Sequence, residues 1–156
     1  MTDLTNAAVS STRPLMPNGQ PLPEDFDEAL IHGVVHDFYD KIRQDDLLGP
    51  VFNNRIAADQ WPVHLARMCD FWSSSFLRTD RYDGRPLPPH LGIPELSETH
   101  FERWLHLFHE TVNDRCSPEA ARGFYDLARR IAHSFRLAVA FHRGEDTIGI
   151  VPFPAR

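Results

Sequence analysis

Basic charge, cysteine and long apolar runs are all scarce in this chain of 156 residues. Its 16 lysines and arginines are outnumbered by 22 acidic residues, which gives a formal net charge of −6. Because nucleic acids attract proteins through positively charged surfaces, this balance argues against nucleic-acid binding. No window approaches the roughly 18 consecutive apolar residues that a membrane-spanning helix needs, so we expect no membrane span.

The two cysteines and the N-terminal residues point to the compartment. Cys69 and Cys116 stand apart and are too few for a disulfide framework or a cysteine-based zinc site. The N-terminal residues do not combine a basic stretch with an apolar run, as a secretory signal would. We therefore expect a protein of the reducing cytoplasm.

Several motifs that carry well-defined chemistry are missing. The absence of Gly-x-Gly-x-x-Gly, P-loop and Gly-x-Ser-x-Gly motifs argues against dinucleotide, P-loop nucleotide and α/β-hydrolase chemistry. No glutamate precedes a histidine by three residues, so the Glu-x-x-His pairs of di-metal bundles are missing too. His109-Glu110 is followed by Asn113 where a zinc protease would have its second histidine.

The distribution of prolines divides the chain into three parts. Residues 1–23 carry prolines among small polar residues, and we expect a disordered N-terminal extension. Residues 24–144 hold the periodic apolar pattern. We expect them to form one globular domain, since 42% apolar and 24% charged residues are ordinary values for such a domain. Residues 145–156 form a short C-terminal tail that contains two further prolines.

Four helices are predicted from apolar residues that recur every three or four positions. The first covers about residues 25–43 and the second about residues 59–77. The third follows Ser97, which has the character of an N-cap, and the fourth begins at Ser117-Pro118, a capping residue before a proline. Gly144 ends the fourth helix. No strand pattern is present, so the predicted fold class is all-α.

The stretch from Asp80 to Pro94 is different, because its glycines and prolines exclude a long helix. Loops of this length inside a compact domain are usually functional or disordered. His90 lies here, within Arg85-Pro86-Leu87-Pro88-Pro89-His90-Leu91. A proline-restricted backbone can hold a ligating imidazole with little loss of entropy. The alternative is a loop histidine without a role.

A second histidine lies on the flank of the helix predicted at 59–77. At 100° per residue, His64, Met68, Phe71 and Ser75 form a narrow strip beside the main apolar stripe. Such a side chain suits the wall of an apolar cavity, and the alternative is a partly buried surface histidine. The other helix histidines lie away from the apolar faces or at their edges, and we expect them at the surface. They are His32, His36, His100, His106, His109 and His133.

Six short motifs follow one another between about residues 30 and 143. They are Phe38-Tyr39-Asp40-Lys41-Ile42-Arg43, Leu48-Gly49-Pro50-Val51-Phe52-Asn53, Trp61-Pro62-Val63-His64, Phe71-Trp72, Tyr82-Asp83-Gly84-Arg85-Pro86-Leu87-Pro88-Pro89-His90-Leu91 and Phe101-Glu102-Arg103-Trp104-Leu105-His106-Leu107-Phe108. Their order and spacing resemble those of the truncated haemoglobins of the third group, which are small bacterial globins. This resemblance implies a two-over-two helical sandwich around haem b.

The resemblance also assigns roles to particular residues. The family's proximal iron ligand corresponds to His90, just after the proline-rich stretch. Its distal tyrosine, histidine and tryptophan correspond to Tyr39, His64 and Trp104. Whether His64 itself coordinates the iron is left open.

Further residues are expected to contact the haem. Phe52 matches the family's phenylalanine that packs on the haem plane, and Met68, one turn after His64, would lie over the iron. Arg67 suits a haem propionate because the two charges are opposite. Phe71 lies on the same strip as His64 and is expected to line the pocket.

The resemblance implies reversible binding of dioxygen, nitric oxide or other diatomic ligands at a five-coordinate or exchangeable iron. Two hydrogen-bond donors, Tyr39 and Trp104, would slow the release of dioxygen. Slow release favours oxidation of nitric oxide or reduction of peroxide, and either reaction needs an external reductant, such as a reductase. The alternatives are a haem-based gas store or sensor without turnover, and a haem-free helical interaction domain.

Overall fold

The computed structural model describes residues 13–156, and this part of the chain is helical. Its helices are α2 (Glu28–Gln44), α3 (Leu48–Asn53), α4 (Trp61–Phe76), α5 (Leu87–Leu91), α6 (Glu98–Arg115) and α7 (Pro118–His142), with the 3-10 turn η1 (Ala58–Gln60) directly before α4. No strand occurs within these described residues, so the prediction of an all-α fold is confirmed.

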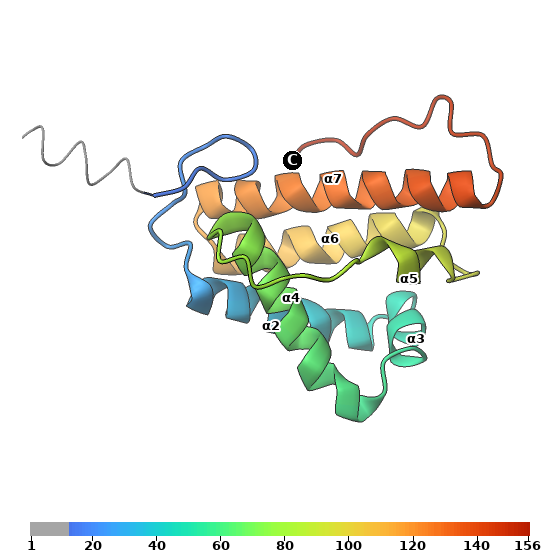
Figure 1. Ribbon diagram of the computed structural model, residues 1–156, viewed down its shortest axis with the longest axis horizontal. Helices are drawn as coiled ribbons and strands as arrows, with labels where there is room; N and C mark the ends of the chain where they lie inside the picture. Colours follow the sequence, from blue (N-terminus) through green and yellow to red (C-terminus); the bar gives the residue numbers. More distant parts are fainter. Residues whose placement is uncertain (1–12) are drawn as a thin grey trace, which may run out of the picture.

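The four long helices form two pairs (Figure 1). α6 and α7 lie side by side, whereas α2 and α4 cross one another, and α2 also contacts α6. The short helix α3 contacts α2 and α6, and α5 contacts α7. This is the predicted two-over-two arrangement. Within residues 13–156, no helix has both the length and the apolar character that crossing a bilayer requires.

The long helices α2, α6 and α7 begin at residues whose side chains cap them, whereas α4 follows η1 without a side-chain cap. The Asp27 carboxylate accepts a hydrogen bond of 2.8 Å from the backbone N–H three residues on, which starts α2. Ser117 does the same for α7 at 3.3 Å, and Pro118 follows it. Before α6, the backbone N–H of Ser97 donates to Nδ1 of His100 at 3.1 Å. Local capping chemistry therefore explains why the predicted and observed starts of α2, α6 and α7 agree within a few residues.

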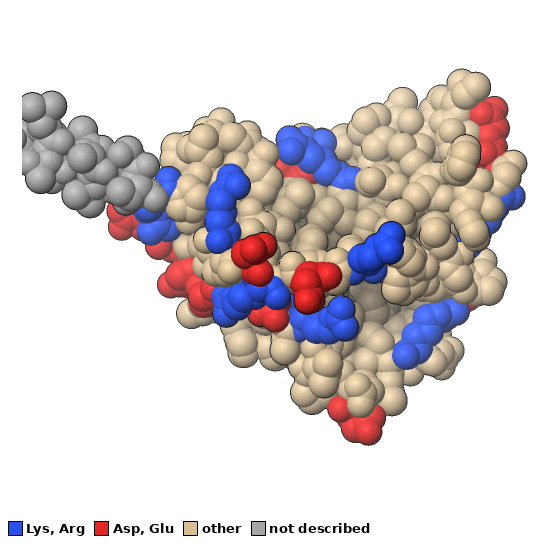
Figure 2. Space-filling view, in the orientation of Figure 1, with Lys and Arg blue, Asp and Glu red and all other residues tan. Residues whose placement is uncertain are grey.

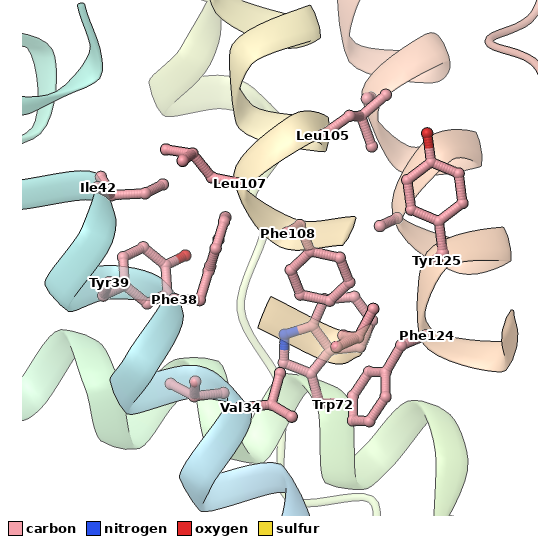
Figure 3. Packing of buried hydrophobic residues seen from close by; sticks show 14 of the residues in the cluster. Val34, Phe38, Tyr39, Ile42, Trp72, Leu105, Leu107, Phe108, Phe124 and Tyr125 are labelled. Carbon is pink, nitrogen blue, oxygen red and sulfur yellow. The ribbon is translucent and has the colours of Figure 1, made fainter. Parts of the chain in front are cut away.

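Aromatic side chains fill the space between the two helix pairs (Figure 3). Trp72 of α4 stacks on Phe108 of α6 with ring centroids 5.2 Å apart, and Phe124 of α7 meets Trp72 edge-on at 5.5 Å. Phe26, just before α2, stacks on Phe76 and on Phe124 at 4.5 Å each. All five rings are buried. Because each such side chain stabilises the fold by about 1.5–3 kcal/mol on burial, this cluster holds the crossing helices together.

The segment 13–23 belongs to the folded body, although the sequence predicts disorder for it. Met16 and Leu22 are buried, and the Arg13 guanidinium donates to the Pro23 carbonyl at 2.8 Å. Met16 rests on Gly123 of α7, where a Cβ atom would collide with its sulfur. The isolated apolar residues find their partners far away in the sequence, which local composition does not reveal. The rest of the predicted extension, residues 1–12, lies outside the described residues.

The C-terminal tail 145–156 folds back along α7 (Figure 1). Arg136, which is only 8% exposed, donates to the Val151 carbonyl and pairs with Glu98 at the start of α6. Its guanidinium also lies 3.7 Å from the ring centroid of Phe153. A single buried cation therefore joins the tail, α6 and α7.

Candidate functional site

The structure contains a cavity of about 620 Å³ that is lined by residues of α2, α3, α4, α5, α6 and α7. Its wall is mostly apolar with a few polar groups, and its size is typical of a cofactor or ligand site. In Figure 2, Lys and Arg side chains flank a hollow between α4 and α5. The structure places every predicted site residue on the cavity wall: Tyr39, Phe52, His64, Arg67, Met68, Phe71, His90 and Trp104.

His90 lies on the short helix α5. Its Nδ1 is 2.6 Å from the Pro86 carbonyl oxygen, which can only accept, so Nδ1 donates and Nε2 keeps the lone pair. Burial lowers the pKa of His90, which favours the neutral ring at neutral pH. The ring also packs on Phe135 of α7 at 4.8 Å between centroids. A neutral imidazole oriented by a carbonyl is the arrangement that metal-ligating histidines have.

The segment after α5 is fixed to α7 by Arg143. Its guanidinium donates to three carbonyl groups of that segment: to Leu96 at 2.6 Å, to Ile93 at 2.8 Å and to Pro94 at 3.1 Å. Charge-assisted bonds of this kind are stronger than neutral ones. They hold the C-terminal side of α5, and with it His90, against α7.

The loop before α5 is fixed to α4 by the buried hydroxyl of Ser73. This hydroxyl donates to Glu28 Oε1 at 2.6 Å, and it accepts from Thr79 Oγ1 at 2.9 Å and from the Arg81 guanidinium at 2.6 Å. Since the one hydroxyl proton goes to the carboxylate, the other two partners must donate. The chain on both sides of His90 is therefore tied to a long helix.

His64 enters the cavity from α4, packed between the rings of Tyr39 and Trp61 at centroid distances of 5.0 and 5.4 Å. Its Nε2 is buried and has no hydrogen-bond partner among the described residues. Burial, and then the nearby charges of Arg67 and His90, lower the pKa of His64 to about 4. An unpartnered buried nitrogen costs free energy, so its presence on the wall of a cavity points to a ligand.

Two hydrogen-bond donors line the same cavity. Burial, and then the nearby Cys69, raise the pKa of Tyr39 well above its usual value, so its hydroxyl stays protonated. The Trp104 ring stacks on Phe108 with centroids 5.7 Å apart and planes 4° from parallel, and its indole N–H can only donate. Both side chains can therefore donate to a polar ligand in the cavity.

The charges on the cavity wall are all positive. Arg55, Arg67 and Arg85 line it, and no carboxylate does among the residues described. Arg55 is neutralised by Glu95, with N–O distances of 2.7 and 3.1 Å. The absence of a side chain at Gly84 lets Arg67 approach closely, since a Cβ there would lie 2.9 Å from its guanidinium. This rim suits a ligand with anionic groups at its edge.

Some wall residues were not predicted. Arg55, Arg85, Tyr82 and Phe135 reach the cavity, and His100, expected at the surface, also lines it. The motif that contains His90 also contains Tyr82 and Arg85, so those two could have been inferred from it. Nothing local to the sequence marks the other three.

The donor set fits a particular kind of ligand. No group of three or more His, Cys, Asp or Glu side chains that could hold a metal ion occurs between residues 13 and 156. The cavity instead offers the imidazole of His90 for ligation, a second imidazole from α4, apolar walls and a cationic rim. These features match haem, a flat apolar group with anionic propionates whose iron already has its porphyrin ligands.

Comparisons with known proteins find relatives of one kind. No family model matches the chain. It is 35% identical over 115 residues to the group 3 truncated hemoglobin ctb of Campylobacter jejuni, over 72% of this chain and 91% of that protein. It is also similar to the crystal structure of a group III truncated hemoglobin from Campylobacter jejuni. The TM-score is 0.71 at 34% identity, over 75% of this chain and 94% of that one.

Proposed function

Since the chain belongs to the group III truncated haemoglobins, we propose that it holds haem b in the cavity and binds dioxygen or another diatomic ligand there. The observation that carries this proposal is the state of two imidazoles on one cavity wall. His90 has its Nδ1 committed to a carbonyl and its Nε2 lone pair available, and His64 has a buried Nε2 without a partner.

Six of the cavity-lining residues would hold the haem. His90 is the ligand to the iron, and the bond from Nδ1 to Pro86 keeps its ring neutral and oriented. Arg67 and Arg85 receive the propionates, while Phe52, Met68 and Phe71 cover the porphyrin faces. Haem would supply an iron able to bind a diatomic ligand.

The distal side chains act on that ligand. Tyr39 and Trp104 donate hydrogen bonds to it, and the apolar wall keeps water away, so these bonds are stronger than in solvent. His64 stands beside them as a neutral side chain, because its pKa of about 4 prevents protonation at neutral pH. Two donors slow the release of dioxygen, and slow release suits ligand chemistry better than bulk transport.

Nitric oxide is the substrate that we propose for such chemistry, with peroxide as the alternative. Oxidation of nitric oxide to nitrate by dioxygen needs one added electron per turnover (NO + O2 + e− gives NO3−). The electron must come from a separate reductant, such as a reductase. Consumption of nitric oxide by the purified protein with a reducing system tests this step, and a rate no higher than that of free haemin contradicts it.

Haem binding itself is tested by visible absorbance of the purified protein, two variants and a control variant. His90→Ala should lose most of the haem, whereas His64→Ala should keep it. His100→Ala is a control, since that histidine also lines the cavity but engages Ser97. Equal haem retention in His90→Ala and His64→Ala, or a colourless wild-type protein, contradicts the proposal.

The roles of the two donors are tested by stopped-flow measurement of dioxygen release. Loss of one buried donor removes about 1 kcal/mol, so Tyr39→Phe and Trp104→Phe should each speed release about fivefold. Tyr125→Phe is the matched control, because Tyr125 is buried against His109 and is not among the cavity-lining residues. Unchanged rates in both distal variants remove them from the proposed network.

A further inference from the structure

Two histidines of α2 form a pair outside the cavity. His32 is exposed and His36 is partly exposed, and they are one helical turn apart. Their rings stack with centroids 3.8 Å apart and planes 21° from parallel. Neither ring is among the residues that line the cavity, so the haem proposal does not account for the pair.

The hydrogen bond of His36 determines which of its nitrogens is available. Nδ1 lies 2.8 Å from the His32 carbonyl oxygen. Because that oxygen can only accept, Nδ1 carries the proton and Nε2 carries the lone pair. His90 has the same arrangement with the carbonyl four residues before it. His36 therefore has the orientation, tautomer and backbone support that metal-ligating histidines have.

Other histidines in the described part of the chain are engaged differently. His106 lies 3.8 Å from the Glu110 carboxylate, and Nδ1 of His133 accepts from the Arg136 guanidinium at 3.2 Å. The carboxylate next to the pair, on Asp37, is itself paired with Arg115 of α6. The α2 pair thus presents two imidazoles side by side, and the nearest acidic side chain along the helix is already neutralised.

From this geometry we propose that His32 and His36 form a surface site for a divalent transition metal, with Cu²⁺ bound most tightly. Imidazole nitrogens suit Cu²⁺, Ni²⁺ and Zn²⁺, and Cu²⁺ stands highest in the usual order of affinity. Histidines four residues apart on one helix face bind one ion together in zinc proteases. The exposed His32 ring can leave the stack and turn a nitrogen toward the ion that Nε2 of His36 holds. Water fills the remaining positions.

The test is a titration of the full chain, purified without a histidine tag, with Cu²⁺ alone. Calorimetry measures affinity and stoichiometry, and electron paramagnetic resonance detects nitrogen coupling to the copper. We expect one equivalent to bind through two nitrogens. His32→Gln and His36→Gln should each weaken binding about tenfold or more, because each removes one of the two proposed ligands and even loss of a group that only supports a metal ligand typically costs about that much. Zn²⁺ should bind the same site more weakly.

The matched control is His106→Gln, which removes an exposed histidine from α6 and should leave Cu²⁺ binding unchanged. Circular dichroism verifies that all variants stay folded. Wild-type affinity in His32→Gln and His36→Gln overturns the proposal. So does a loss in only one of the two variants, or an equal loss in His106→Gln. None of these outcomes depends on haem binding, so the two proposals can fail separately.

Discussion

The unusual state of His64 makes the stability of the haem-free protein depend on pH. In the unfolded chain its pKa is near 6.5, and in the folded chain it is about 4. As the pH falls below 6.5, the His64 imidazole therefore becomes protonated in the unfolded state but stays neutral in the folded state. The folded state loses stability progressively down to about pH 4, below which both states are protonated.

The size of this effect follows from the two values. At pH 5 the unfolded imidazole is mostly protonated and the folded one mostly neutral, a difference of about 2 kcal/mol. Partial exposure of the ring reduces this to about 1–2 kcal/mol. Between pH 7 and pH 5, the free energy of unfolding of His64→Leu should therefore fall by about 1–2 kcal/mol less than that of the wild type. The substitution should also raise stability at pH 7 by about 1–3 kcal/mol, because the unpartnered Nε2 is gone.

Urea unfolding of wild type and His64→Leu at both pH values, followed by tryptophan fluorescence, measures these differences. The acid sensitivity caused by His90, whose pKa is also lowered, is common to both proteins and cancels. An identical loss between pH 7 and pH 5 in wild type and His64→Leu would refute the assignment of a neutral, buried His64.

Other perturbations test the packing around the site. Met16→Ala should lower the free energy of unfolding by about 2–4 kcal/mol, because Met16 is buried. The control Leu15→Ala should change it by less than about 1 kcal/mol, because Leu15 is 53% exposed. Equal effects of the two substitutions would contradict the burial of segment 13–23. Arg143→Gln should destabilise by about 1–3 kcal/mol and speed haem loss, and chemical denaturation with transfer of haem to apomyoglobin measures both. Ser73→Ala should lower the free energy of unfolding, measured by chemical denaturation, by about 1–3 kcal/mol. Ser75→Ala should lower it less, because the Ser75 hydroxyl bonds only to a carbonyl of its own helix.

The long helices were predictable because each repeats its apolar residues over several turns. The short helices α3 and α5 were not, since six and five residues are fewer than the window over which a helical period can be measured. In α5, Pro88 and Pro89 indicate a loop when read as composition. Both lie in the first turn of the helix, where a missing N–H breaks no helical hydrogen bond.

The cavity wall was predictable to different degrees. His64 could be placed near a cavity from its neighbours Met68 and Phe71 on the helix surface. Tyr39 lies off the main stripe of α2, and only the family resemblance assigns it to the cavity. His100 could not be placed, because its approach to the cavity depends on how α6 crosses α3. Periodicity thus predicts which face of a helix a side chain occupies, whereas contacts between helices can be known only from the folded structure.

The buried guanidinium of Arg136 has a consequence for anyone engineering this chain. A version shortened after Gly149 would remove both the Val151 oxygen and the Phe153 ring that shelter that cation. The exposed charge would then draw water into the interface between α6 and α7. Arg136 lies on α7, and the same helix carries Phe135, which packs on His90. Removal of residues 150–156 should therefore also disturb the packing of Phe135 on His90.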